Sequence, residues 1–169
     1  LREGDAESLH AMFSDPQVMR YWSNPPWTSM DQAHAFLAKD LEAVREGRYL
    51  RLGIEPRDSQ VLVGQCTLYD FNQQCRRAEM GYSLAASAWG KGFMHEALTA
   101  LVSYAFNQLD LNRIEADVDP RNTASARSLE RLGFPRDGHM RQRWIVAGEV
   151  SDTGFYGLLR SDWTPAPSG

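Results

Sequence analysis

The amino-acid sequence predicts an α/β or α+β fold around one mixed sheet. The first indication is that the spacing of apolar residues changes repeatedly between the helical and the strand period along the chain. The second is that the helical segments interrupt a β-rich chain without a regular strand–helix–strand rhythm. The third is length, because 169 residues most often form one domain with a substantial core.

Two segments with helical spacing come first. Asp5–Phe13 predicts a short helix. A second helix is predicted to start near Ser29, because Ser29 and Gln32 have the spacing of a capping box, and to end at Gly47. The apolar positions of this second helix form one stripe: Ala33, Phe36, Leu37, Leu41 and Val44.

Strand-like runs and further helices follow, separated by residues that favour turns. The first three strands are predicted at Tyr49–Ile54, Val61–Phe71 and Ala78–Leu84. We then predict a long helix at about Gly92–Leu109, a strand at Arg113–Val118, a helix at Asn122–Leu132 and final strands at about Gly138–Val146 and Val150–Leu159. Residues 164–169 are predicted to form a loose tail.

Composition narrows the class of protein. The formal net charge of −4 argues against a general nucleic-acid binder. The longest apolar runs are too short to span a membrane, and residues 1–5 do not resemble a secretion signal. Cys66 and Cys75 lack metal-site spacing, and the histidines have no partner spacing that suggests a metal. These features favour the reducing cytoplasm, with no metal, nucleic acid or membrane as partner.

The segment Ala88–Met94 carries the clearest chemical signal. Gly90 and Gly92 flank Lys91 directly after a strand-like run, and a helical segment begins at once. Glycines allow a close backbone approach and positive φ angles. The helix directs its free N–H groups and the positive end of its dipole toward the turn. This arrangement suits a pyrophosphate and indicates a nucleotide- or coenzyme-binding enzyme.

Further motifs lie in a fixed order around this turn. They are Ala78–Leu84, Trp89–Met94, and Asn122–Ser125 with Leu129–Phe134. Together they resemble the GNAT N-acetyltransferases, and more closely the RimJ/RimL-type branch, to which Trp144–Glu149 and Tyr156–Leu159 are also similar. The resemblance implies one domain over residues 1–163, with a truncated first strand, and a flexible tail at 164–169. It also implies a mostly antiparallel mixed sheet with a splayed strand pair and about four flanking helices.

The resemblance implies that acetyl-CoA is the cosubstrate. The backbone of Tyr82, Ser83 and Leu84 would pair with the pantetheine arm like an added strand. Asn122 would contact the same arm, cap its helix, or do both. Trp89 stands where the family commonly has Gln or Arg, and its side chain would instead cover the ribose or the turn itself. The amides that would bind the pyrophosphate belong to Trp89, Gly90, Lys91, Gly92, Phe93 and Met94.

Glu79 is the candidate general base. A carboxylate in an otherwise apolar strand is uncommon, and a base with a raised pKa suits amine acetylation. The alternative is an exposed strand residue paired with Arg76 or Arg77.

The acid that protonates the departing thiolate is less defined. Many GNAT enzymes have a tyrosine seven residues after the motif asparagine, and Leu129 stands there in this chain. Ser125 is the candidate, either as a catalytic group, a CoA contact or a surface helix residue. Ser128, Tyr156 and a water are the alternatives.

Tyr21, Trp22 and Trp27 cluster around two prolines and are candidates for the wall of the amine site, where aromatic faces hold cations. The alternative is that they attach the first two helices to the core. The predicted function is direct, ternary-complex acetylation of a primary amine, either a protein N-terminal α-amine or a small molecule. A non-catalytic acyl-CoA sensor or scaffold on the same fold is the alternative. The family also makes a homodimer plausible.

Overall fold

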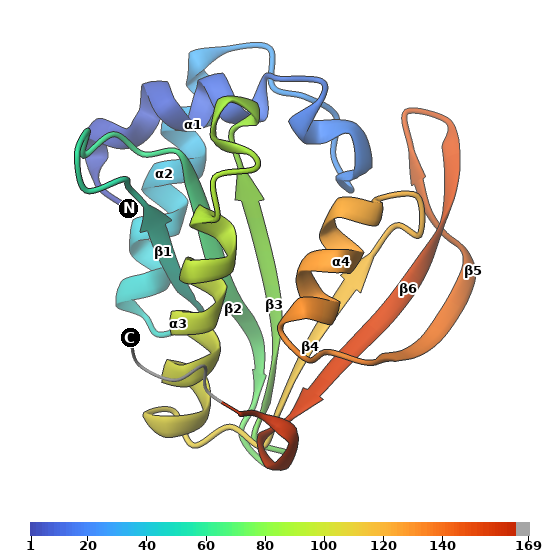
Figure 1. Cartoon of the computed structure of the whole chain (residues 1–169). Helices are drawn as coiled ribbons and strands as arrows, with labels where there is room; N and C mark the ends of the chain where they lie inside the picture. Colours follow the sequence, from blue (N-terminus) through green and yellow to red (C-terminus); the bar gives the residue numbers. More distant parts are fainter. Residues whose placement is uncertain (165–169) are drawn as a thin grey trace.

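The central sheet positions every other element. The computed structural model describes residues 1–164, and within them six strands form one sheet in the order β1-β2-β3-β4-β6-β5 (Figure 1). Neighbouring strands are antiparallel except β3 and β4, which are parallel, so the mixed and mostly antiparallel sheet is confirmed. The strands are β1 (Leu50–Ile54), β2 (Gly64–Asn72), β3 (Arg77–Leu84), β4 (Arg113–Val118), β5 (Arg136–Val146) and β6 (Glu149–Leu159).

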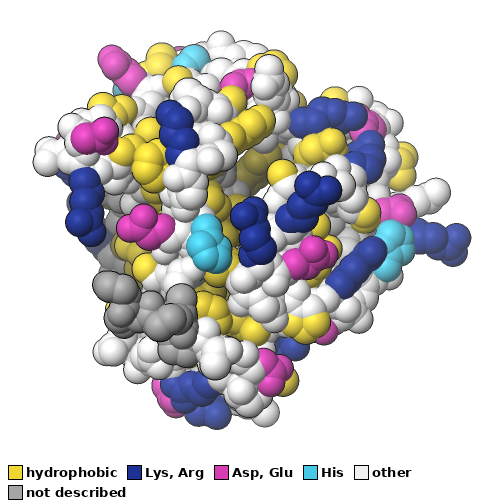
Figure 2. All heavy atoms as spheres, in the orientation of Figure 1, with side chains coloured by type: hydrophobic (Ala, Val, Ile, Leu, Met, Phe, Trp, Pro, Cys, Tyr) yellow, Lys and Arg dark blue, Asp and Glu magenta, His cyan; other side chains and the backbone are white. Residues whose placement is uncertain are grey.

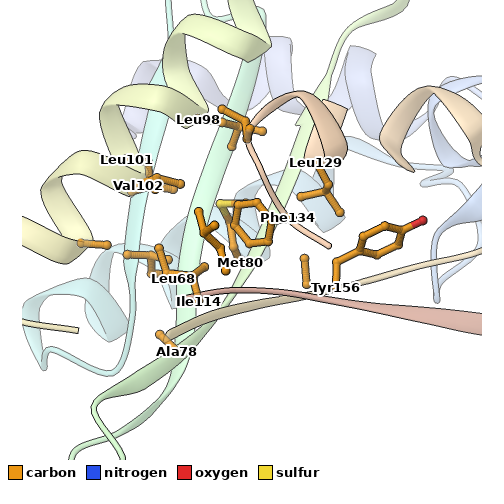
Figure 3. Close-up of a cluster of buried hydrophobic side chains, with 14 of the residues drawn as sticks. Leu68, Ala78, Met80, Leu98, Leu101, Val102, Ile114, Leu129, Phe134 and Tyr156 are labelled. Atoms are coloured by element: carbon orange, nitrogen blue, oxygen red, sulfur yellow. The ribbon is translucent and has the colours of Figure 1, made fainter. Parts of the chain in front are cut away.

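Helices cover both faces of the sheet. On one face lie α3 (Phe93–Asn107) and α4 (Thr123–Arg131), and Figure 3 shows the apolar core between these helices and the strands. The helices α1 (Ala6–Phe13) and α2 (Met30–Arg45) pack against each other around a second apolar cluster. In the part of the chain that the structure describes, no helix is long and apolar enough to cross a membrane.

The helix α2 keeps its predicted cap and adds a buried charge. The capping box of Ser29 and Gln32 is present. Asp40 is only 1% exposed, and its Oδ1 lies 2.7 Å from Nε of Arg51 in β1. Arg51 also donates to Oε1 of Gln65 at 2.6 Å. A carboxylate removed from water needs such a partner, so this contact fixes α2 against the sheet.

Strand boundaries differ from the prediction by more than one residue at two places. The run predicted from Val61 enters the sheet only at Gly64, because Leu62 packs with the α1–α2 cluster instead. The strand β5 begins at Arg136, two residues before the predicted start. Apolar character alone does not reveal which core a residue joins. Most of the predicted tail, residues 165–169, lies outside the described residues.

The strands β3 and β4 separate after three paired residues. Arg77–Glu79 pairs with Arg113–Glu115, and within residues 1–164 no later part of β3 pairs with β4. The rest of β4 instead stays with β6, up to the pair of Val118 and Gly154. Figure 1 shows the two strands diverging toward the end where α3 and α4 begin. The splayed strand pair is therefore confirmed.

Candidate active site

A cavity of about 570 Å³ lies where β3 and β4 separate. Residues on both faces of the sheet line it: Gly81 and Asp117 on one face, Tyr82 and Val118 on the other. Its wall is completed by the loop at residues 16–26, the start of α4 and the β5–β6 hairpin. The cavity thus passes through the sheet, so two reactants can approach one point from opposite faces.

One wall of the cavity is an unpaired backbone edge. The Arg76 carbonyl accepts amides from the start of β4, whereas the Ala85 amide donates to the Val63 carbonyl beside β2. Backbone groups alternate along a strand, so those of Met80, Tyr82 and Leu84 face the gap that β4 leaves. The structure differs from the prediction at Ser83, whose backbone faces β2.

The glycine turn supplies a second set of free donors. Gly90 and Gly92 have φ angles of +73° and +83°, and no atom lies within 4 Å of a Cβ added at either position. The backbone conformation, rather than crowding within the chain, therefore requires glycine. The first backbone bond of α3 runs from Glu96 to the Gly92 carbonyl. The amides of residues 90–95 accordingly have no acceptor within the described chain, as expected of a phosphate site at a helix N-terminus.

Trp89 departs from the predicted role. Its amide already donates to the Ala86 carbonyl at 3.2 Å, and its indole Nε1 donates to the Leu84 carbonyl at 2.8 Å. The indole therefore covers the turn itself, one of the two roles that the sequence left open. The side chain of Lys91 is exposed beside it. On the same face of the sheet, basic side chains gather over α4 (Figure 2).

The first turn of α4 faces the open edge of β3. Asn122 is the N-cap, and its Oδ1 accepts the amide of Ser125 at 3.1 Å. The Ser125 hydroxyl lies 2.7 Å from the hydroxyl of Tyr82. Burial raises the pKa of Tyr82 to about 12, against the opposing effect of the hydrogen bond with Ser125. Both predicted residues of α4 therefore lie beside the predicted cofactor strand.

Glu79 lies at the point where β3 and β4 part. Removal from water raises the pKa of its carboxyl, and the negative charges of Asp70 and Asp117 raise it further, whereas the hydrogen bond from Tyr69 lowers it. Glu79 itself does not line the cavity, but its neighbours Tyr69 and Asp117 do. Arg77 pairs with Glu115 instead of Glu79, which disfavours the ion-paired alternative.

The three predicted aromatic residues separate into two groups. Tyr21 and Trp22 line the cavity, and their place in the wall of the amine site stays a prediction. Trp27 does not. Its ring packs 4.7 Å from that of Phe13 and 5.4 Å from that of Phe36, so it joins α1 to α2 as the alternative expected. Trp22 also contacts Phe13, edge to face at 5.5 Å.

An ionic cluster that the sequence did not predict lies beside Tyr21 in the cavity wall. Glu149, in the β5–β6 hairpin, lies 3.1 Å from Arg20 and 2.5 Å from Arg121, which also binds Asp119 at 2.6 Å. The guanidinium carbons of both arginines lie within 6 Å of the Tyr21 ring centre, at 5.4 and 5.7 Å. The hydrogen bonds from Arg121 and Arg20 hold the pKa of Glu149 below its usual range.

Other candidates are placed away from the cavity. Leu129 is fully buried in the main core. The hydroxyl of Ser128 donates to the Ala124 carbonyl at 2.9 Å, and Tyr156 belongs to the core. Burial raises the pKa of the Cys66 thiol to about 11. Among residues 1–164, no group of three or more His, Cys, Asp or Glu side chains could hold a metal ion.

Comparison with known proteins identifies the family. The model of the acetyltransferase (GNAT) domain matches residues 1–135. This chain belongs to the GNAT acetyltransferase family. An uncharacterized N-acetyltransferase p20 of Bacillus licheniformis is 35% identical over 159 residues, which cover 94% of this chain and 89% of that protein. The uS5-alanine N-acetyltransferase of Escherichia coli (strain K12), which acts on a ribosomal protein, is 29% identical over 83% of this chain and 77% of that protein.

Solved structures of the family have the same fold. The crystal structure of spermidine N-acetyltransferase from Vibrio cholerae in complex with CoA and spermine superposes with a TM-score of 0.84 at 25% identity, over 96% of this chain and 94% of that chain. The present chain is accordingly an N-acetyltransferase with acetyl-CoA as its cosubstrate.

Proposed function

We propose that this GNAT enzyme transfers the acetyl group directly from acetyl-CoA to a primary amine while both are bound. The observation that carries the proposal is the cavity that passes through the sheet, because it gives the two reactants separate approaches to one point. Holding them together supplies much of the rate. An acetyl-cysteine intermediate is disfavoured, because Cys66 is 2% exposed and lies in the main core.

Backbone groups bind the cofactor in this proposal. The backbone of Tyr82 and the amide of Leu84, whose carbonyl already accepts the Trp89 indole, pair with the pantetheine arm, and Asn122 contacts the arm from the start of α4. The amides of residues 90–94 hold the pyrophosphate at the N-terminus of α3. Exposed Arg127 and Arg131 on α4 favour the phosphates of CoA on the same face.

The reaction needs a base and a stabilised oxyanion. Glu79 takes, through a water, the proton that the neutral amine nitrogen loses as it attacks the thioester carbonyl, and its raised pKa makes it a stronger base than an ordinary carboxylate. A backbone N–H on the open edge of β3 stabilises the oxyanion. The carbon–sulfur bond breaks, and Ser125 gives its proton to the sulfur.

The acceptor is a primary amine with further positive charge. Asp117 lines the cavity and has no ion-pair partner within residues 1–164. Tyr21 and Trp22 add aromatic faces, which attract cations. The similarity to enzymes named for spermidine and for a ribosomal protein supports polyamines and basic protein N-termini as the acceptors to test first. The relative that acts on a ribosomal protein also supports the RimJ/RimL-type branch. Three points remain predictions: a single domain over residues 1–163, a cytoplasmic location and a homodimer.

The test measures release of the CoA thiol from acetyl-CoA with a panel of N-terminal peptides, polyamines, amino acids and aminoglycosides. We expect saturable turnover with one cationic class. Initial rates measured at varied concentrations of both substrates should give intersecting reciprocal plots, as a ternary complex requires. Parallel plots would instead indicate an acyl-enzyme. CoA binding without turnover across the panel would favour the acyl-CoA sensor or scaffold.

A further inference from the structure

Two hydroxyl groups meet beside the cavity, one from β3 and one from α4. The oxygens of Tyr82 in β3 and Ser125 in α4 are 2.7 Å apart, and the Tyr82 hydroxyl also lies 3.3 Å from the Ser125 carbonyl. Both residues line the cavity. The pair therefore connects α4 to the part of β3 that β4 has left.

Ser125 is held differently from the other serine of its helix. A serine within a helix commonly bonds to the carbonyl one turn earlier, as Ser128 does to Ala124 at 2.9 Å. Ser125 makes no such backbone bond in the described chain. Its amide is fixed by Asn122 and its hydroxyl by Tyr82. The Ser125 hydroxyl therefore lies at the cavity wall and is not hydrogen-bonded to a carbonyl of its own helix.

We propose that Tyr82 is the positioning residue for the Ser125 hydroxyl and that the two together protonate the leaving sulfur of CoA. The inference rests on the acetyl transfer proposed above. Ser125 is the residue of α4 that can perform this step, because among the hydroxyl groups of that helix it alone lines the cavity within the described residues. Leu129, one turn further along, has no proton to give and lies in the core.

The protons balance over one turnover. As the carbon–sulfur bond breaks, its electron pair goes to sulfur, which takes the proton of Ser125 Oγ. Oγ takes the proton of the Tyr82 hydroxyl. The proton that the amine nitrogen loses passes through Glu79 to water in the cavity, and water returns one proton to Tyr82. The products are the amide and the free thiol, and the enzyme ends unchanged.

The experiment compares Tyr82→Phe, Ser125→Ala and the double variant in the full chain, with the acceptor found in the panel. We expect each single change to lower kcat about 10- to 100-fold, while the Kd for CoA stays within about twofold. The double variant should be no slower than the slower single variant, because residues that act as a unit are not additive. Ser125→Thr, which keeps a hydroxyl, should be more active than Ser125→Ala when Tyr82 is present. It should not be more active when combined with Tyr82→Phe.

Ser128→Ala is the matched control, because it removes a hydroxyl from the same helix that is bound to backbone. Its kcat should equal that of the wild type. Unchanged kcat in Tyr82→Phe, additive losses in the double variant, or equal kcat in Ser125→Ala and Ser128→Ala would each overturn the inference. The last comparison holds even if Tyr82→Phe does not fold. Wild-type protein that binds CoA without any turnover would instead refute the acetyl transfer itself.

Discussion

The two ends of the cavity are built from different materials. The proposed cofactor end consists of backbone groups, namely the open edge of β3, which borders the cavity, and the amides of residues 90–95, which lie outside its lining. The proposed acceptor end consists of side chains, with Arg20, Arg121 and Glu149 brought together from three distant segments. Backbone donors survive most substitutions, whereas a side-chain cluster changes with each one. Side-chain substitutions should therefore affect the proposed acceptor end more than the proposed cofactor end.

The largest expected effect is a loss of kcat on substitution of Glu79, which lies between the two ends. Glu79→Gln should lower kcat about 100- to 1,000-fold and leave the Kd for CoA unchanged, because it removes the base and no cofactor contact. In the wild type kcat/KM should rise as the pH rises through the elevated pKa of Glu79, and this acid limb should vanish in the variant. A pH series of initial rates checks both expectations.

Stability gives Glu79→Gln an independent check. Because the folded state raises its pKa, Glu79 contributes stability that is present below the ordinary carboxyl pKa and is lost as the pH rises through the folded one. The variant should thus have a Tm at pH 7 that is not below that of the wild type. Glu115→Gln is the control, since this carboxylate pairs with Arg77 and Arg113 outside the cavity. Equal losses of kcat in both variants would refute the assignment of the base.

The next effect should be confined to the cofactor end. Gly92→Val places a β-branched residue at a φ of +83°, which strains the turn that aligns the free amides. We expect the Kd for CoA, measured by calorimetry, to rise at least tenfold. Gly47→Val is matched to it, with a φ of +71° and open surroundings outside the site. Similar CoA affinity in the two variants would show that the turn does not bind the pyrophosphate.

The same division explains what the sequence could predict. The glycine turn, the capping box at Ser29 and the cap at Asn122 are local patterns, so short-range spacing was sufficient to find them. The ionic cluster was not local, since Arg20 and Glu149 are 129 residues apart in the chain. No spacing rule connects such a pair before the fold is known.

Two intermediate cases had signals that were present but ambiguous. Asp117 and Glu115 lie on one face of β4, and the buried Ile114 and Ala116 lie on the other. The alternation alone could therefore have indicated Asp117 as a site residue. For β3, the sequence indicated a strand beside the cofactor but not which residues turn their backbone to the gap. That phase depends on pairing with β2, which placed Tyr82 on the open side and Ser83 on the other.

A smaller expected effect separates two tryptophans of one loop. Trp27→Ala should lower the free energy of unfolding by about 2 kcal/mol, because it removes contacts between α1 and α2, and should leave the acceptor KM unchanged. Trp22→Ala should raise the acceptor KM several-fold, because its ring lines the cavity. Denaturant unfolding and initial rates measure the two quantities. A KM that rises equally in both variants would show that the loop acts on the acceptor as one unit.

The smallest effect should come from the ionic cluster. Glu149→Gln should raise the acceptor KM about two- to fivefold with the KM for acetyl-CoA unchanged, because exposed ion pairs each contribute little and these join three segments only at the acceptor end. Salt screens such pairs, so the difference from the wild type should shrink in concentrated salt. Glu46→Gln removes a similarly exposed pair, with Arg48, after α2 and should change neither KM. If Glu149→Gln raised the KM for acetyl-CoA as much as the KM for the acceptor, the ionic cluster would not act on the acceptor alone. The two ends of the site would then be coupled.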